Sequence, residues 1–156
     1  AQLIDEQVTN IDLSKTPYTV KTATATYSTK SIILAMGATP RILGVPGEQD
    51  YWGKGVTTCA VCDGLFFAGK SIVIVGGGDT AMEYASFMTR LTDDITIVHI
   101  LDAFTASIPM QQRVISNKKI KIIYQSTVTR INGNGQQITS VTISRCVSRR
   151  SSHSFI

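Results

Sequence analysis

The stretch Ser71-Ile72-Val73-Ile74-Val75-Gly76-Gly77-Gly78-Asp79-Thr80-Ala81 decides the fold class of this chain. Its first five residues form a short apolar run that predicts a buried strand, and three glycines follow at once. Asp79 or Thr80 is expected to cap a helix after the glycines, because Thr80 and Glu83 have the spacing of a capping box. A glycine turn between a strand and a helix predicts a dinucleotide-binding site, with a purely structural turn as the alternative.

The small residues of this turn have different expected roles. Gly76 permits the tight turn, Gly78 permits close approach of the backbone to a phosphate, and Ala81 permits close packing of helix on strand. The helix N-terminus adds free N–H groups and the positive end of the helix dipole. The predicted nucleotide-binding residues of this segment are Gly76, Gly77, Gly78, Asp79 and Thr80.

The residues after the turn continue the alternation of strand and helix. Residues 95–100 and 120–124 are predicted strands, and residues 109–116 between them are a predicted helix. Residues 128–131 and 138–143 are predicted to form a hairpin, because Asn132-Gly133-Asn134-Gly135 contains two Asn-Gly turn signals. The pattern predicts an α/β fold, a Rossmann-like three-layer nucleotide-binding domain.

The residues before the turn have a different pattern. Residues 8–11, 18–22 and 25–27 are predicted as short antiparallel strands, and the apolar run 31–35 as a strand buried on both faces. Residues 45–55 are rich in turn formers and are predicted to link two domains. The expected division is residues 1–50, residues 51–143, and a serine- and arginine-rich tail, 144–156, without order.

The composition excludes several classes of protein. The 15 basic and 11 acidic residues give a net charge of +4, but 12 against 11 remain without the three arginines of the tail, so no nucleic-acid footprint is expected. No apolar run approaches the roughly 20 residues of a membrane span, and no signal-like N-terminus is present. Three cysteines do not form a secreted disulfide scaffold, so we expect a cytoplasmic location.

A cysteine pair lies just ahead of the glycine turn, in Cys59-Ala60-Val61-Cys62-Asp63-Gly64. Two cysteines at this spacing can exchange between dithiol and disulfide, and the adjacent carboxyl of Asp63 can move the proton that thiolate chemistry needs. Two buried small side chains are the structural alternative. A zinc site is disfavoured, because Cys146, His99 and His153 do not supply a second ligand pair, and no metal is predicted.

Three motifs resemble the low-molecular-weight thioredoxin reductases. They are the run from Thr58 to Gly64, the glycine turn with Met82-Glu83 behind it, and Ala35-Met36-Gly37-Ala38 followed by Pro46-Gly47-Glu48. Their order and spacing agree with the family over residues 8–143. The Cys-Ala-x-Cys-Asp-Gly signature is specific to that family among flavin disulfide reductases.

The resemblance implies a route for two electrons, from NADPH to FAD, then to the cysteine pair, then to a disulfide of thioredoxin. It implies that Cys62 faces the flavin, that Cys59 attacks the partner's disulfide, and that Asp63 donates and accepts protons. It also implies a homodimer. The FAD residues carried over are Ala35, Met36, Gly37 and Ala38, and His99 joins the NAD(P)H residues.

The chain also departs from the family pattern. The family has His-Arg-Arg where this chain has His99-Ile100-Leu101, and Thr105 replaces a further arginine, so the ribose 2′-phosphate loses its guanidinium partners. Asp102 makes NADH the alternative cofactor. No G-x-G-x-x-G precedes Gly37 and no Gly-Asp flavin motif follows residue 143.

The resemblance implies that residues 1–50 are the trailing part of the first FAD-domain half, built of β strands, and that residues 51–143 are an NAD(P)H-binding domain without its last strand. The expected protein is therefore a truncated thioredoxin reductase with impaired flavin binding. One alternative is a non-catalytic nucleotide-binding fragment or degenerate gene product, and the second is a relative of ferredoxin-NADP reductase. The cysteine pair argues against the second alternative, because those relatives work without a dithiol.

Overall fold

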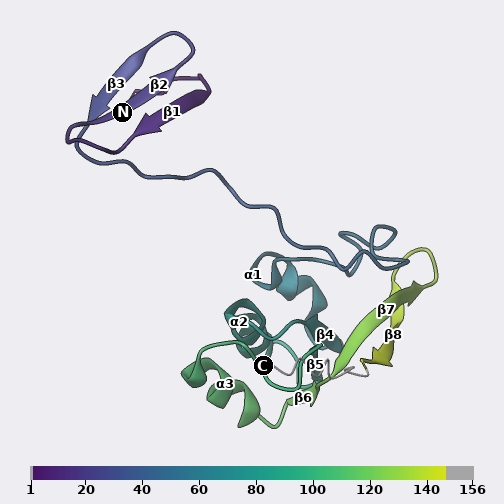
Figure 1. Cartoon of the computed structure of the whole chain (residues 1–156). Coiled ribbons are helices and arrows are strands. Elements are labelled where there is room, and N and C mark those ends of the chain that lie inside the picture. The colour runs from purple at the N-terminus through teal and green to yellow at the C-terminus, as the bar shows by residue number, and fades with distance from the viewer. Residues whose placement is uncertain (1, 147–156) are drawn as a thin grey trace, which may run out of the picture. The chain divides into compact units, whose positions relative to one another are not determined.

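The computed structural model describes residues 2–146 of the chain and divides it into two compact units, residues 1–39 and the residues from 40 onward (Figure 1). The division falls before Pro40, whereas the sequence analysis placed a boundary after residue 50. Residues 45–56 belong to the second unit because they pack on it: Val45, Tyr51 and Val56 join one of its apolar clusters. Residues 45–55, which the sequence predicts to link two domains, are thus part of the folded second unit.

The first unit is a small antiparallel sheet in the order β1-β2-β3. Its strands are β1 (Val8–Asp12), β2 (Tyr18–Thr22) and β3 (Thr26–Thr29). Val20 at the centre of β2 pairs with Ile11 of β1 and with Tyr27 of β3. The three predicted strands are confirmed, with boundaries that move by one or two residues.

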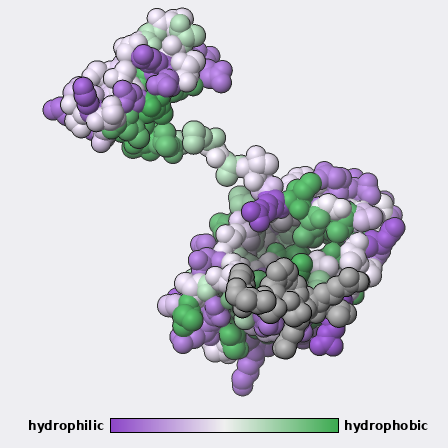
Figure 2. Space-filling model, in the orientation of Figure 1, coloured by the Kyte–Doolittle hydropathy of each residue, from purple (hydrophilic) through white to green (hydrophobic). Residues whose placement is uncertain are grey.

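Residues 31–39 do not form the buried strand predicted for 31–35. They have no regular secondary structure and are mostly exposed, with Ile33 at 92% and Met36 at 85% of their full accessibility. Figure 2 shows apolar residues on the surface of this unit. An apolar run becomes a strand only where neighbours satisfy its backbone groups, and within the described residues no strand pairs with this one.

The second unit is built around a parallel sheet in the order β4-β5-β6, as predicted. β4 (Ile72–Val75), α2 (Asp79–Met88), β5 (Ile95–Val98), α3 (Ile108–Ile115) and β6 (Ile120–Ile123) alternate along the chain. Ile74, Ile97 and Ile122 lie side by side in the register and pack with the apolar faces of both helices. Met82 and Ala85 of α2 are fully buried against this surface.

A hairpin covers a second apolar cluster and completes the three layers. It is formed by β7 (Ser126–Gly133) and β8 (Ile138–Arg145). Val128 and Ile131 of β7 pack with Val98 of β5 and with Tyr51. β5 is therefore covered on both sides, because Ile97 packs in the first apolar cluster and Val98 packs in the second.

The hairpin differs from the prediction at its turn and at its end. Asn132 and Gly133 continue β7, so only the second Asn-Gly pair turns the chain, where the Asn134 side chain accepts the N–H groups of residues 136 and 137. β8 pairs as far as Arg145, two residues beyond the end expected at residue 143. Residues 147–156 of the predicted disordered tail lie outside the described residues.

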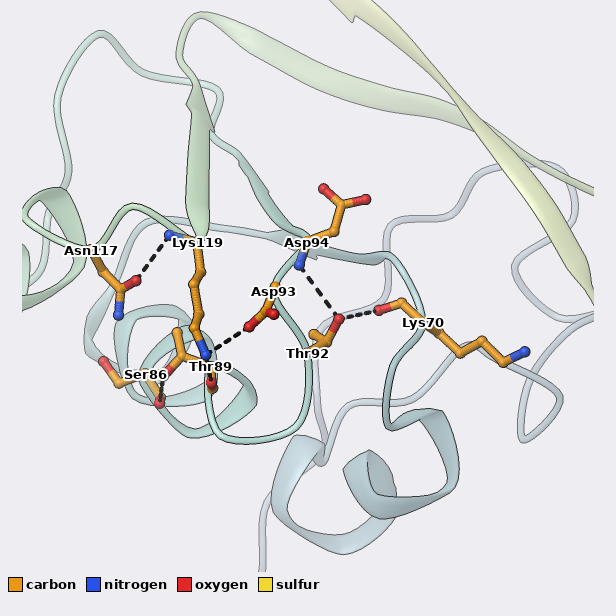
Figure 3. A network of polar contacts seen from close by, with 8 residues as sticks. All are labelled: Lys70, Ser86, Thr89, Thr92, Asp93, Asp94, Asn117 and Lys119. Atoms are coloured by element: carbon orange, nitrogen blue, oxygen red, sulfur yellow. Dashed lines mark hydrogen bonds and ion pairs between the residues drawn. The ribbon is translucent and has the colours of Figure 1, made fainter.

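A network of polar contacts ties the amino-terminal edge of the parallel sheet (Figure 3). Lys119 donates to the carbonyl oxygen of Thr89 and forms an ion pair with Asp93, and Thr92 donates to the carbonyl oxygen of Lys70. Asp94 accepts from Ser71 and Lys121, of which the Ser71 hydrogen bond is the larger cause of its lowered pKa. This edge is held by its own side chains, and it lies opposite the edge at which the glycine turn follows β4.

Candidate functional site

The cysteine pair lies at a short helix that the sequence analysis did not predict. Cys59 is the N-cap of α1 (Ala60–Asp63), and the 3-10 helix η1 (Gly64–Phe67) follows directly. Cys59 and Cys62 form a disulfide with their Cα atoms 5.3 Å apart, and the backbone N–H of Cys62 donates to Sγ of Cys59. A helix of four residues leaves no periodic pattern, so only the cysteine spacing pointed to this segment.

Thr57 joins the first cysteine to the adjacent acid. Its hydroxyl accepts a hydrogen bond from the backbone N–H of Cys59 and donates one to Oδ2 of Asp63. The backbone N–H of Asp63 in turn donates to the carbonyl oxygen of Cys59. The structure therefore brings Cys59, Cys62 and Asp63 together as predicted, and adds Thr57, which the sequence analysis did not single out.

The segment around the disulfide is docked on helix α2. The Tyr84 hydroxyl donates to the carbonyl oxygen of Thr58, and Gly64 lies so close to Met88 and Phe87 that a Cβ there would meet both side chains within 3.1 Å. Beside the disulfide, a groove of about 360 Å³ is bordered by Val61 of α1. Its other lining residues come from α2 and α3: Glu83, Ser86, Phe87, Arg90, Met110 and Arg113.

The two sulfur-bearing residues differ in exposure. Cys62 is exposed and Cys59 is half-buried, and Leu65 and Phe66 of η1 are also exposed. A disulfide at the surface, next to apolar side chains and a shallow groove, is accessible to another protein. Cys146 is the free cysteine of the described residues and lies at the end of β8, away from this segment in the sequence.

The glycine turn has the geometry that its sequence predicted. Gly76 has φ of +136°, a conformation that residues with a side chain rarely adopt, and its N–H donates to the carbonyl oxygen of Val98. Gly78 is the N-cap of α2 in extended conformation, and a Cβ there would meet only the Thr105 hydroxyl, at 4.0 Å. Open space above a helix N-terminus fits a pyrophosphate, which the first N–H groups of the helix would bind.

The predicted cap of α2 is wrong. The helix begins at Asp79, and its N-cap is Gly78. Neither Asp79 nor Thr80 is therefore the N-cap, and no side chain forms a capping hydrogen bond at this helix start. Asp79 instead accepts hydrogen bonds at Oδ1 from both the backbone N–H and the hydroxyl of Ser107, the N-cap of α3. These two hydrogen bonds join the start of α2 to the start of α3 through Asp79.

His99 supports the glycine turn from inside the fold. Its side chain is almost fully buried, at 6% exposed, and its Nε2 donates to the carbonyl oxygen of Ala103 at 3.1 Å. A Cβ on Gly77 would lie 2.5–2.6 Å from three atoms of the His99 ring. Gly77 is therefore a glycine because the imidazole occupies the space beside it.

The loop after His99 borders the same turn. The backbone N–H groups of Thr105 and Ala106 both donate to the carbonyl oxygen of Gly77, at 2.9 and 3.0 Å. Ile100, Leu101 and Asp102 are exposed on this loop. The structure thus gathers Gly76, Gly77, Gly78, Asp79, Thr80 and His99 at one edge of the sheet.

The residues predicted to border a flavin belong to the other unit of the chain. Ala35, Met36, Gly37 and Ala38 lie in the first unit, all exposed in a segment without regular structure. Their contact with FAD stays a prediction. The glycine turn and the disulfide both lie in the second unit.

The sequence also predicts that the chain has neither a metal site nor a membrane span. No group of three or more His, Cys, Asp or Glu side chains within residues 2–146 is arranged to hold a metal ion. Among the same residues, no helix is long and apolar enough to cross a membrane.

Comparison with known proteins gives the family. Residues 1–148 match the family described as pyridine nucleotide-disulphide oxidoreductase. The thioredoxin reductase of Mycolicibacterium smegmatis is 45% identical over 134 residues, covering 86% of this chain and 43% of that protein. The bifunctional thioredoxin reductase/thioredoxin of Mycobacterium leprae is 46% identical over 134 residues, covering 85% of this chain and 29% of that protein.

The fold gives the same result. The structure of the thioredoxin reductase from Giardia duodenalis superposes with a TM-score of 0.79 at 40% identity, covering 94% of this chain and 48% of that one. The chain thus spans less than half the length of the relatives that it matches.

Proposed function

Because the chain belongs to the pyridine nucleotide-disulphide oxidoreductase family, we propose that it carries the redox-active disulfide and the nicotinamide-nucleotide site of a thioredoxin reductase. The observation that carries the proposal is the Cys59–Cys62 disulfide, closed at an exposed helix start with Asp63 held beside it. The similarity to thioredoxin reductases over most of the chain supports this assignment.

The reduced pair would transfer two electrons to a partner disulfide. A thiolate of the pair attacks one partner sulfur, the partner's S–S bond breaks, and a mixed disulfide forms. The leaving partner sulfur takes up a proton. The second thiolate of the pair then attacks the mixed disulfide, which restores the Cys59–Cys62 bond and releases the second partner sulfur as a thiol after it takes up a proton.

We assign the attacking role to Cys59 and the proton transfers to Asp63. The N–H of Cys62 donates to Sγ of Cys59, and such a donor stabilises a thiolate on that sulfur. Asp63 follows Cys62 directly and is held by Thr57, so a carboxyl group stands in the same short helix as the cysteine pair. Cys62 would be the sulfur that receives electrons from the flavin in the whole protein.

The glycine turn would hold the nicotinamide nucleotide. The backbone N–H groups at the start of α2 would bind its pyrophosphate, Gly78 would leave space for the phosphates, and His99 would fix Gly77. When bound, this nucleotide supplies a hydride. FAD is implied by the family, and residues 35–38, which would border it, are exposed in a segment without regular structure. We expect the isolated 156-residue chain to purify without stoichiometric flavin absorbance.

The proposed partner is thioredoxin or a similar small dithiol protein. The Mycobacterium leprae relative carries a reductase and a thioredoxin in one chain according to its name, which supports this choice. The exposed Leu65 and Phe66, on the 3-10 helix that follows the disulfide, provide a surface that such a partner can contact. We further propose that the whole protein works as a homodimer in the cytoplasm, where thiols stay reduced.

The experiment that tests this proposal requires neither the nicotinamide nucleotide nor FAD. The chain is reduced chemically, freed of reductant, and mixed with oxidised thioredoxin, and the thiols of each protein are counted by mass spectrometry. All samples carry Cys146→Ser, so that the free cysteine contributes no thiol. We expect thioredoxin to gain two thiols as the Cys59–Cys62 disulfide returns.

Single cysteine variants decide the roles. With Cys62→Ser, attack by Cys59 should stop at a mixed disulfide with thioredoxin, whereas Cys59→Ser should trap far less. No transfer of thiols from the reduced parent would reject thioredoxin reduction and favour a non-catalytic nucleotide-binding fragment. Equal trapping by both variants would reject the assignment of Cys59 as the attacking sulfur.

A further inference from the structure

We propose that Tyr84 is a positioning residue for the proton transfers of Asp63, which it supports through a chain of three hydrogen bonds that runs from α2 to the carboxylate. The inference rests on the proposed role of Asp63 in thiol transfer and adds a residue that lies outside the Cys-x-x-Cys segment. It follows from the direction of each hydrogen bond and from the exposure of α1.

The chain of hydrogen bonds begins at α2 and ends at Asp63. The Tyr84 hydroxyl donates to the carbonyl oxygen of Thr58 at 3.1 Å. That carbonyl belongs to the same peptide group as the N–H of Cys59, which donates to the hydroxyl oxygen of Thr57 at 3.0 Å. The Thr57 hydroxyl then donates to Oδ2 of Asp63. All three donors therefore point in the direction of the carboxylate.

Hydrogen bonds that are aligned in this way strengthen one another. A donor to a peptide carbonyl oxygen polarises the peptide group, so the N–H of Cys59 becomes a stronger donor to Thr57. The Thr57 oxygen accepts that bond, and its own proton is directed at Asp63. Because Thr57 binds Oδ2, Oδ1 is the oxygen that is left to exchange a proton with a sulfur. Loss of the Tyr84 hydroxyl would therefore weaken the hold on a carboxyl group that Tyr84 itself does not bind.

Helix α2 gives this chain of hydrogen bonds a firm support, whereas α1 has little packing of its own. None of the four residues of α1 is buried. Tyr84 lies between Met82 and Ala85 in the sequence, which are fully buried in the core, and its own side chain is half-buried. The Tyr84 hydroxyl therefore has a fixed position beside a short helix that depends on contacts from outside it (Figure 1).

The test measures the rate of thiol transfer from the chemically reduced chain to oxidised thioredoxin over a range of pH, with Cys146→Ser in every sample. Tyr84→Phe should slow the transfer roughly fivefold, the effect of one hydrogen bond of ordinary strength. It should also change the pH profile in the same direction as Thr57→Val does. Because Thr57→Val already breaks the chain of hydrogen bonds, Tyr84→Phe should add no further loss of rate in the double variant, whereas independent effects would multiply.

Tyr51→Phe is the matched control, because it removes a hydroxyl of the second unit that also makes a hydrogen bond with the backbone, at the N–H of Gly135. We expect it to leave the rate and the pH profile of thiol transfer unchanged, even where it lowers the urea midpoint as much as Tyr84→Phe does.

Two results would overturn the inference and leave the proposed function in place. One is an unchanged rate of thiol transfer in Tyr84→Phe. The other is a loss of rate in the double variant equal to the product of the two single losses, which would make Tyr84 a tether of α1 alone. Absence of thiol transfer from the parent would overturn the proposed function and the inference together.

Discussion

Replacing Gly77 by alanine tests whether the buried imidazole shapes the glycine turn. The new Cβ would lie 2.5–2.6 Å from three ring atoms of His99, well inside van der Waals contact. The ring cannot move away freely, because it is buried, donates to the carbonyl oxygen of Ala103, and packs 5.8 Å from the centroid of Phe104. Overpacking of this kind costs about 1–3 kcal/mol.

Loss of the hydrogen bond from His99 to Ala103 would add about 1 kcal/mol if the ring rotates. We therefore expect Gly77→Ala to lower the free energy of unfolding of the second unit by about 2–4 kcal/mol. The assay is urea unfolding followed by the fluorescence of Trp52, which is the one tryptophan of the chain and lies in this unit. The midpoint should fall while the slope with denaturant stays the same.

Gly78→Ala is the matched control at the next position. Its Cβ would meet only the Thr105 hydroxyl at 4.0 Å, and its φ of −87° suits any residue. We expect a change of less than about 1 kcal/mol, because the loss of a favourable N-cap is offset by the lower entropy of the unfolded chain. Nucleotide binding should nevertheless weaken in Gly78→Ala, since the methyl group takes the space of a phosphate.

A double-mutant cycle of Gly77→Ala with His99→Ala completes the test. Removing the ring removes the clash, so the double variant should be more stable than the sum of the two single effects predicts, by about 1–2 kcal/mol. An unchanged urea midpoint in Gly77→Ala would refute the argument. Strict additivity in the cycle would show that the cost does not come from the imidazole.

Three other predictions follow from contacts of the second unit. Gly47→Ala should cost about 3 kcal/mol or more in the same unfolding assay, because φ is +87° and the Cβ would overlap a backbone carbonyl oxygen of β7. The Ser71 hydrogen bond lowers the pKa of Asp94 in the folded chain below 3.8, its ordinary value, so the ionised carboxylate stabilises the fold. The free energy of unfolding should therefore fall as the pH falls below 3.8, and Asp94→Asn should make this fall smaller in an acid titration of stability. Thr57→Val should slow thiol transfer from the reduced pair roughly tenfold and change its pH profile, whereas Thr57→Ser, which keeps the hydroxyl beside Asp63, should not; equal rates for both would contradict the positioning role.

The sequence predicted the parts of the fold that depend on local periodicity. The order of strands and helices from residue 71 to 143 was correct, because each apolar run was bounded by glycine or polar residues. The buried strand predicted at residues 31–35 was wrong, because an apolar run does not reveal whether neighbouring strands exist to bury it. The boundary after residue 50 differs from the structure for a related reason: Val45 packs against the cluster that contains Val128 and Ile131, far away in sequence.

The candidate site shows the same limit. The cysteine spacing predicted the pair, but nothing in the sequence showed that Thr57 would bridge Cys59 and Asp63. The cap of α2 was wrong because Ser107, 28 residues away, competes for the carboxylate of Asp79. Long-range hydrogen bonds leave no period in a sequence, so the residues that position a site are harder to predict than those that carry its chemistry.

Helix α2 unites the two halves of the proposed chemistry. Its first turn follows the glycines, and Tyr84, about 9 Å further along the helix than Gly78, binds the carbonyl oxygen next to Cys59. Gly64 packs on Met88 at the end of the same helix. The disulfide and the glycine turn are therefore both held by one helix, whose Met82 and Ala85 are fully buried in the core. A helix fixed in this way holds the two parts of the proposed site at a constant separation within the second unit.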